Sequence, residues 1–220
     1  MNGTANPNDS DGIWVIGAGG HAKVVIETIW AAGETVAGVF DSDPKKNGSN
    51  VLGASVTAPF SNETLAQLNA RRAVIAIGSN QARKRLAEEL SGIEWVTIIH
   101  PFSYVSPSAR VANGSVVFAG AVIQANANIG AHTIINTSSS VDHDCIIGDW
   151  SHVAPGAHLA GGVRLGEGVL AGVGCQVLPK ITAGSWSVIG GGALVNTDIP
   201  ERAVATGVPI RLTRQSDPKK

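Results

Sequence analysis

Aliphatic residues or alanine recur every six positions from Ile99 to about Pro200, with no position missed and no insertion. A second series, of small or β-branched residues, lies two positions before members of the first and runs from Ala109 to Val163. Side chains two apart on an extended segment point the same way, so both series should face inward. The first series is Ile99, Val105, Val111, Val117, Ile123, Ile129, Ile135, Val141, Ile147, Val153, Leu159, Leu165, Ala171, Val177, Ala183, Ile189 and Val195.

This spacing is the hexapeptide signature of a parallel β-helix. Gly, Asn and Asp near the remaining positions let the chain turn a corner after each short strand. Three hexads close one triangular coil, and successive coils stack by strand pairing. We therefore predict an all-β domain over residues 99–201 with about five to six coils, each sealing its neighbour.

The chain before residue 99 has another pattern, in which short apolar runs alternate with segments of helical period. It predicts strands at 13–16, 35–40 and 73–77 and helices at 22–32, 63–70 and 81–90. Such alternation forms a small Rossmann-like parallel sheet, an α/β domain over residues 12–98 with ligand groups at the carboxyl ends of its strands. Residues 1–11 are predicted to be disordered, and residues 202–220 to form a turn and a solvated tail.

A glycine-rich turn, Gly17-Ala18-Gly19-Gly20-His21, follows the first strand. Glycines there let the backbone approach a phosphate at a helix N-terminus. Gly17 and Gly19 match the first two glycines of a dinucleotide fingerprint, but the third falls on Ala22; Asp41 supplies an acidic residue further on. The turn leaves two readings open, a generic tight turn or a nucleotide or nucleotide-sugar site. The small sheet argues against NAD.

Composition narrows the partners. Apolar residues make up 44% of the chain and aromatic residues 5%, which suits a core of Val, Ile and Ala. The net charge of −1 gives no basic footprint for nucleic acid. No apolar run approaches the roughly 20 residues of a membrane span, and the polar N-terminus does not resemble a signal peptide, so we expect a cytoplasmic protein. Cys145 and Cys175 occupy small inward positions and should be buried thiols.

The densest run of polar residues in the repeat is 136–145, and it contains His143 and Asp144. With Val141 inward, both fall near the following corner and can project from the core. A carboxylate beside an imidazole can hold one ring nitrogen as a donor and raise the basicity of the other, as general-base catalysis requires. The alternative reading is a solvated corner in which His143 has no role.

Metal and serine chemistry are weaker alternatives. Zinc needs converging ligands, and residues of the repeat stack directly only when 18 apart, a spacing that no two histidines have. His132, His152 and His158 should therefore lie on different faces or corners unless subunits contribute jointly. Ser138 to Ser140 lack a nucleophile-elbow motif. We expect no metal site.

The chain resembles the bacterial nucleotide-amino-sugar N-acetyltransferases, a hexapeptide-repeat family related to the sialic acid O-acetyltransferases, and the perosamine N-acetyltransferases among them. The resemblance covers residues 13–209. It depends on the start Ile16-Gly17-Ala18-Gly19-Gly20-His21-Ala22-Lys23-Val24-Val25, on 76–80, on 136–139 leading to His143, on 151–157 and on Gly207-Val208-Pro209. The resemblance implies a left-handed β-helix, which spacing alone does not establish.

The resemblance also implies a homotrimer with active sites between neighbouring β-helices, acetyl-CoA along the cleft and a nucleotide-linked 4-amino sugar held by the N-terminal domain. His143 matches the general base and Asp144 its orienting carboxylate, where family members often carry Glu. His152, Val173 and Gly191 match the acetyl-CoA site, and Asn136 is a candidate sugar contact. The nucleotide contacts are matched by Gly19, Gly20, His21, Asp41, Ser42 and Gly78.

The resulting hypothesis is direct acetyl transfer to the 4-amino group of a GDP-perosamine-like sugar, with His143 as base. The alternatives are a sugar O-acetyltransferase, a non-catalytic nucleotide-sugar-binding trimer and, more remotely, a metal-dependent hydratase. Residue patterns do not decide between GDP and UDP, nor whether the product serves lipopolysaccharide O-antigen, capsule or protein glycosylation.

Overall fold

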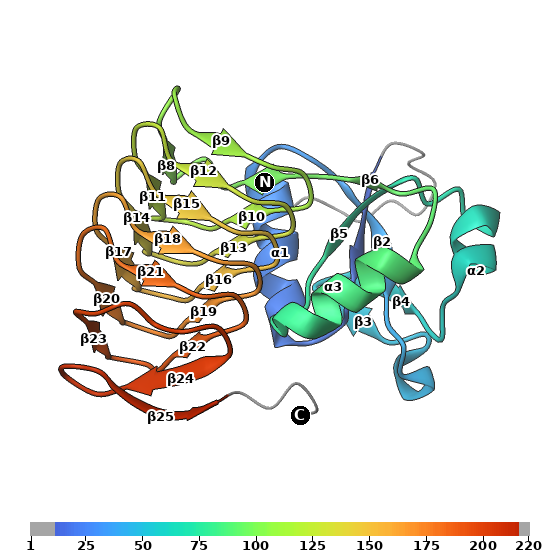
Figure 1. The fold of residues 1–220 in the computed structure, drawn as a ribbon. Helices are drawn as coiled ribbons and strands as arrows, with labels where there is room; N and C mark the ends of the chain where they lie inside the picture. The colour runs from blue at the N-terminus through green and yellow to red at the C-terminus, as the bar shows by residue number, and fades with distance from the viewer. Residues whose placement is uncertain (1–11, 216–220) are drawn as a thin grey trace. The chain divides into compact units, whose positions relative to one another are not determined.

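The computed structural model describes residues 12–215 of the chain (Figure 1). The predictions for residues 1–11 and for the last five residues of the tail lie outside this range. The chain divides into two compact units, residues 1–101 and 102–220. The first is a small parallel α/β sheet of Rossmann type, and the second is a left-handed parallel β-helix.

The first unit contains one mixed sheet with strand order β3-β4-β2-β1-β5-β6. Its strands are β1 (Ile13–Ile16), β2 (Val36–Phe40), β3 (Asn50–Val51), β4 (Ala54–Thr57), β5 (Arg72–Ile75) and β6 (Glu94–Trp95), and β7 (Ile98–Ile99) follows. Its helices are α1 (Gly20–Ala31), α2 (Asn62–Gln67) and α3 (Asn80–Glu89), with a 3₁₀ turn at Pro44–Lys46. The three predicted strands and three predicted helices are confirmed, with ends shifted by up to three residues.

The β3–β4 hairpin was not predicted. It is the one antiparallel pair of this sheet, joined by Leu52 and Gly53, which both have positive φ. Such two-residue turns usually carry Asn or Gly first, and a leucine there hides the signal.

The core of the first unit forms around β1, β2 and β5. Ile16, Phe40 and Ile75 are almost fully buried. The ring of Trp14 stacks on Phe40 with centroids 4.4 Å apart. It also lies across Gly38, its partner on β2, where an added Cβ would come within 2.6 Å of the indole. Gly38 is therefore needed for packing.

The second unit winds sixteen two-residue strands, β8 to β23, and the four-residue strand β24 into three parallel sheets. One, the β14 sheet, has β8 (Tyr104–Val105), β11 (Val122–Ile123), β14 (Ser140–Val141), β17 (His158–Leu159), β20 (Gln176–Val177) and β23 (Leu194–Val195). The β15 sheet has β9 (Arg110–Val111), β12 (Asn128–Ile129), β15 (Ile146–Ile147), β18 (Arg164–Leu165) and β21 (Thr182–Ala183). The β16 sheet has β10 (Val116–Val117), β13 (Ile134–Ile135), β16 (His152–Val153), β19 (Leu170–Ala171), β22 (Val188–Ile189) and β24 (Ala203–Thr206).

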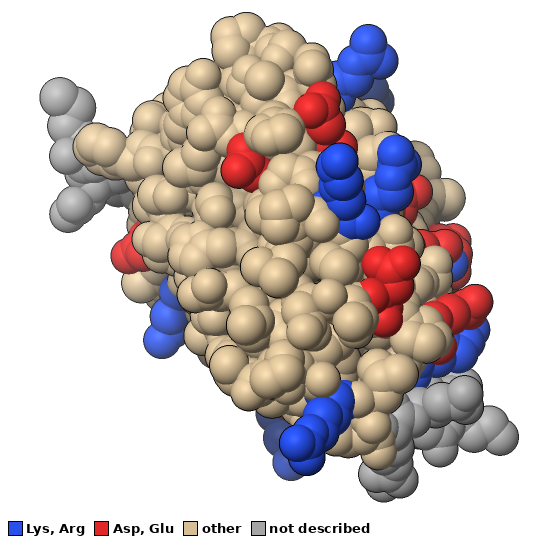
Figure 2. Space-filling model, turned by 60° about the vertical axis from the view of Figure 1, so that its left-hand side comes forward, with Lys and Arg blue, Asp and Glu red and all other residues tan. Residues whose placement is uncertain are grey.

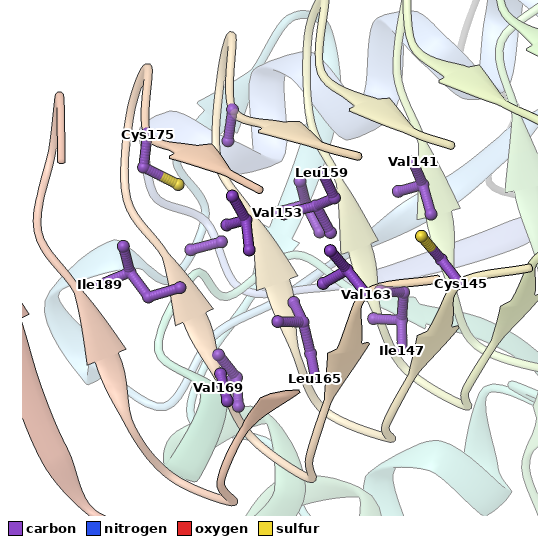
Figure 3. Packing of buried hydrophobic residues seen from close by; sticks show 14 of the residues in the cluster. Val141, Cys145, Ile147, Val153, Leu159, Val163, Leu165, Val169, Cys175 and Ile189 are labelled. Carbon is purple, nitrogen blue, oxygen red and sulfur yellow. The ribbon is translucent and has the colours of Figure 1, made fainter. Parts of the chain in front are cut away.

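The register confirms the predicted coil. Val122 pairs with Ser140, and Ser140 pairs with His158, each 18 residues further on. The second residue of each strand points inward, and from Val117 to Val195 these side chains are at most 2% exposed. The small series packs beside them, and Cys145 and Cys175 lie within this core (Figure 3).

Both ends of the repeat differ from the prediction. Ile99, the first member of the inward series, is 38% exposed, and Val105 and Val111 are half-buried. No earlier coil of the repeat covers these first members. At the other end, the expected tail contains β25 (Arg211–Gln215), which pairs antiparallel with β24 and extends the β16 sheet.

Candidate active site

Three lines of corner residues run along the β-helix. We call them the Asn136 corner (136–139, 154–157, 172–175, 190–193), the His143 corner (124–127, 142–145, 160–163) and the His132 corner (130–133, 148–151, 166–169, 184–187). At each corner the third residue has left-handed backbone, as at Ser138 (φ 54°), Asp144 (φ 59°) and His132 (φ 52°). Asp and Asn tolerate this conformation better than most residues. The local fold therefore favours Asp or Asn at position 144.

His143 and Asp144 form a hydrogen-bonded pair at their corner. Nδ1 of His143 lies 2.8 Å from Oδ2 of Asp144, and both side chains are about three-fifths exposed. The backbone N–H of His143 donates to Oδ1 of Asp142 at 2.7 Å. Asn126, one coil earlier, donates from Nδ2 to Oδ1 of Asp144 at 3.3 Å. The shorter Asp thus reaches the ring, and it is itself held in place.

This pairing sets the basicity of the ring. The hydrogen bond to Asp144 raises the pKa of His143 above its usual value; partial desolvation opposes this, and the charges of Asp142 and Asp144 add to it. The same bond, helped by Asn126, lowers the pKa of the Asp144 carboxyl. An ionised Asp144 makes Nδ1 the protonated nitrogen of the neutral ring, so Nε2 is the basic atom.

Gly161, one coil after His143, supports the imidazole. A Cβ added there would lie 2.5 Å from Nε2, 2.6 Å from Cε1 and 3.2 Å from Cδ2 of His143. These three distances place the ring face against the glycine. The backbones are joined as well, since the N–H of Gly162 donates to the carbonyl oxygen of His143 at 2.9 Å. The sequence interpretation missed Gly161 and Asn126, although each lies 18 residues, one coil, from a member of the His143–Asp144 pair.

The other predicted residues of this unit gather at the Asn136 corner. Nδ2 of Asn136 lies 3.0 Å from Nε2 of His152. Further along the same corner Val173 and Gly191 stack directly, because the N–H of Gly192 donates to the carbonyl oxygen of Val173 at 2.8 Å. Val173 is 61% exposed, although it is apolar. These residues form a line over about three coils, roughly 14 Å long.

Within one chain the two groups do not meet. The chain passes from the Asn136 corner through the β14 sheet to the His143 corner, so one sheet separates them. The outward residues of that sheet include no Lys, Arg, Asp or Glu: they are Tyr104, Val122, Ser140, His158, Gln176 and Leu194. Figure 2 brings this side of the β-helix forward and shows a broad area without Lys, Arg, Asp or Glu.

The predicted nucleotide residues of the first unit do meet, at the carboxyl ends of three adjacent strands. Gly19, Gly20 and His21 follow β1, Asp41 and Ser42 follow β2, and Gly78 follows β5. β2 pairs with one side of β1 and β5 with the other, so the strand order changes direction at β1. In open α/β sheets ligands bind at such a point, outside the carboxyl ends of the strands. We call the segments 17–21, 41–43 and 77–80 the edge loops.

The structure gives different reasons for the presence of glycine at different positions of the edge loops. Gly17 has φ +109°, and a Cβ there would come within 3.0 Å of Ala76 and Ile77, so the fold requires it. At Gly19, Gly20 and Gly78 an added Cβ would meet nothing within 4 Å. Packing does not demand glycine at these three positions, and open space beside bare backbone suits a ligand that approaches closely.

Asp41 joins two of the edge loops, 17–21 and 41–43. Its Oδ2 accepts from the N–H of Ala18 at 2.7 Å and from Nζ of Lys46 at 2.8 Å, and its Oδ1 accepts from the N–H of Asp43 at 2.9 Å. Burial alone would raise its pKa, but the bonds from Lys46, Asp43 and Ala18 lower it overall. Asp41 is 8% exposed, so much of its accepting capacity serves the protein itself.

Two further findings concern the remaining candidates. Burial, and secondarily the charge of Arg83, lowers the pKa of His21 to about 4, so its ring is neutral near pH 7. Burial raises the pKa of Cys145, and that of Cys175 to about 12, which leaves both thiols protonated. Over residues 12–215 no three His, Cys, Asp or Glu side chains group in a way that could hold a metal ion. No helix in this range is long and apolar enough to cross a membrane.

Comparison with known proteins gives matches over both units. The family described as the PglD N-terminal domain matches residues 12–90. One matching structure is a perosamine N-acetyltransferase from Caulobacter crescentus, a variant with one histidine replaced by asparagine, in complex with CoA and GDP-perosamine. It is 41% identical to this chain, with a TM-score of 0.88. The match covers 92% of this chain and 97% of that one.

The acetyltransferase domain of PglB from Neisseria gonorrhoeae, in complex with acetyl coenzyme A, is 36% identical with a TM-score of 0.84, over 92% of this chain and 99% of that one. UDP-N-acetylbacillosamine N-acetyltransferase from Bacillus subtilis is 40% identical over 112 residues, 46% of this chain and 48% of that protein. The chain spans less than half the length of the curated relatives that it matches.

Proposed function

Because the chain belongs to the bacterial nucleotide-amino-sugar N-acetyltransferases, we propose that it transfers the acetyl group of acetyl-CoA to the 4-amino group of a nucleotide-linked amino sugar. The observation that carries the proposal is the His143–Asp144 pair at 2.8 Å, with Nε2 as its basic atom. A solvated corner without a role would not need a ring oriented by a carboxylate, by Gly161 and, through Asn126, by the preceding coil.

In the proposed reaction His143 acts as general base. The amine nitrogen attacks the thioester carbonyl carbon, and Nε2 of His143 accepts the proton that this nitrogen loses. The tetrahedral intermediate then expels the thiolate of CoA, which takes up that proton, so the products are an amide and a free thiol. Asp144 stabilises the imidazolium that forms between the two steps. General-base catalysis of this kind by His143 is worth roughly 10²- to 10⁴-fold in rate.

The Asn136 corner suits acetyl-CoA. The exposed apolar side chain of Val173 and the bare backbone of Gly191 offer a strip against which an extended pantetheine arm can lie. Val208, 71% exposed in the turn between β24 and β25, adds an apolar contact nearby: the adjoining Gly207 accepts, through its carbonyl oxygen, from the N–H of Leu194 at 3.1 Å. His152 and Asn136 place polar groups at the other end of the strip, where they can contact the acetyl group or the sugar.

The edge loops suit the nucleotide. Helix α1 begins at Gly20, and Gly19 and Gly20 leave room for a ligand; backbone N–H groups at a helix start favour phosphate. His21, Asp41, Ser42 and Gly78 surround this point on the adjacent loops. The GDP-perosamine in the complex of the Caulobacter relative supports GDP as the nucleotide, and the name of the Bacillus relative supports UDP as the alternative.

A homotrimer completes the proposed site. The outward face of the β14 sheet, which carries no Lys, Arg, Asp or Glu, lies between the Asn136 and His143 corners. If three copies turn this face toward a common axis, the His143 corner of one meets the Asn136 corner of the next. Each active site would then combine a base from one subunit with an acetyl-CoA strip from its neighbour. This also explains why one chain keeps the two groups apart.

Thiol release tests the function directly. Purified protein is incubated with acetyl-CoA and a panel of 4-amino and 4-hydroxy nucleotide sugars carrying GDP or UDP, and free CoA is followed with a thiol reagent. We expect release with one 4-amino nucleotide sugar, an acetylated product by mass spectrometry, and a particle of three times the 22.5 kDa chain mass. Release with 4-hydroxy sugars would indicate an O-acetyltransferase, and binding without release a non-catalytic protein. Location in the cytoplasm stays a prediction.

A further inference from the structure

Arg83 is the largest side chain that is almost completely buried, at 1% exposure, and neither proposed reaction step uses it. It lies in the first turn of α3, beside two other cations of the same helix that remain more exposed, Lys84 and Arg85. Helical spacing puts residue 83 on the face of Leu86, Ala87 and Leu90, which pack on the core of the first unit. An apolar residue would be the ordinary choice there.

The guanidinium is bonded to one edge loop at three points. Nη1 donates to the carbonyl oxygen of Ile77 at 2.9 Å and to that of Gly78 at 3.4 Å. Nη2 donates to Oδ1 of Asn80 at 2.8 Å. Arg83 therefore spans the whole segment from the end of β5 to the start of α3, the loop that contains Gly78.

Only arginine can make this set of contacts. Its planar fork carries several donors in fixed directions, whereas the lysine ammonium is a compact point charge on a flexible stem. Burial lowers the pKa of Arg83 to about 9, so the group remains charged near neutral pH at a cost that packing does not require. A buried charge held for its geometry indicates that the shape of this loop matters.

Arg83 also acts on a second edge loop. Its charge contributes, after burial, to the low pKa of His21 in the first turn of α1. The first turn of α1 follows β1 and the loop 77–80 follows β5, and these two strands pair directly with each other. The ligand-facing positions of the two loops, Gly19, Gly20 and Gly78, have open space beside them.

We propose that Arg83 is a positioning residue for the nucleotide sugar, holding the loop 77–80 in the shape that receives the ligand without touching the ligand itself. This rests on the proposed function, in which the edge loops bind the nucleotide. Loss of the contacts between Arg83 and the loop 77–80 should raise the KM for the nucleotide sugar and leave acetyl transfer to the bound sugar intact.

The test compares R83K and R83Q with R85Q. Arg85 is on the same helix, is 72% exposed and faces Glu89 at 3.8 Å, so R85Q removes a charge without touching the loop. For R83K and R83Q we expect the KM for the nucleotide sugar and the Kd for GDP, or for UDP if that is the substrate's nucleotide, to rise roughly tenfold, as when about one hydrogen bond is lost. The kcat and the KM for acetyl-CoA should stay within about twofold of wild type, as should all constants of R85Q.

A second variant guards against loss of folding. N80A removes the hydrogen bond from Nη2 of Arg83 to Oδ1 of Asn80 and keeps the buried cation, and it should raise the KM for the nucleotide sugar about threefold. Unchanged KM and Kd in N80A and in whichever Arg83 variant folds would overturn the inference, even if their Tm falls. A wild-type protein that binds neither GDP nor UDP and uses no nucleotide sugar would overturn the proposed function, and the inference with it. Normal wild-type turnover confines the failure to Arg83.

Discussion

His143 and His132 stand at two corners of the same β-helix, one residue apart in the six-residue repeat, and their surroundings are opposite. His132 is 5% exposed, and its ring stacks on Trp150 with centroids 4.3 Å apart and planes 8° from parallel. The His143 side chain is 61% exposed and is paired with a carboxylate. Both rings lie against a glycine of an adjacent coil, Gly114 for His132 and Gly161 for His143.

The difference teaches that the corner position alone does not make a histidine reactive. His132 occupies the left-handed residue of its corner, and the next coil places an indole over it. His143 precedes the left-handed residue, which is Asp144, so its neighbour in sequence is also its hydrogen-bond partner. We interpret the first histidine as packing and the second as a base.

Replacing each histidine should give opposite effects. H143A is expected to lower kcat by roughly 10²-fold or more because it removes the general base, with little change in stability because the side chain is exposed. H132N, which keeps a residue tolerant of left-handed backbone, should lose about 1–2 kcal/mol of unfolding free energy with its aromatic contact and keep its kcat. Steady-state kinetics and urea unfolding measure both. Wild-type turnover in H143A would remove this residue from its role.

Changing the partner of the base should move the pH profile. A raised pKa means that His143 stays protonated to higher pH, so kcat/KM should be lost as pH falls through that pKa. D144N removes the carboxylate and keeps a residue that accepts left-handed backbone. The pKa of His143 should then fall, the acid limb should shift to lower pH, and kcat should drop on the order of tenfold. An unshifted acid limb would show that another group controls it.

The contact between Gly161 and the His143 ring, which we call the seat of the ring, should give the smallest effect and has the closest control. G161A would put a methyl group against the imidazole and should lower kcat about three- to tenfold by displacing Nε2. G162A strains a backbone at φ +72°, but its nearest neighbour is Lys180 and not the ring. We expect G162A to lose about 1 kcal/mol of stability and to keep kcat. Equal kinetic losses in both variants would contradict the seat.

Much of the β-helix could be predicted from its sequence because the repeat states a geometry. Val141 and Cys145 are buried where the count of six puts them, and His143 projects from a corner as expected. The first coil departs from it at Ile99, since burial there depends on a neighbour that the pattern cannot supply. The β3–β4 hairpin was missed because its turn begins with Leu52, a residue without the usual turn preference.

The candidate site was harder to predict from the sequence than the β-helix. His143 and Asp144 are neighbours in sequence, so their pairing could be foreseen, but Gly161 acts by lacking a side chain 18 residues away. Arg83 left a signal, a charge on the apolar face of α3, but two other cations beside it obscure which one is buried. Asp41 was assigned to the ligand, and its contacts with Ala18 and Lys46 appear only in three dimensions.

The unbroken count of six turns chain length into a measure of angle. Each hexad advances the β-helix by one third of a turn, so deleting six residues between His158 and Leu170 would carry Val173 and Gly191 around to the His132 corner. Deleting eighteen residues between His152 and Val173 would leave their direction unchanged and bring them one coil nearer to His152. Insertions and deletions between homologous enzymes of this kind should therefore come in whole coils, or as loops that leave and rejoin a corner without altering the count.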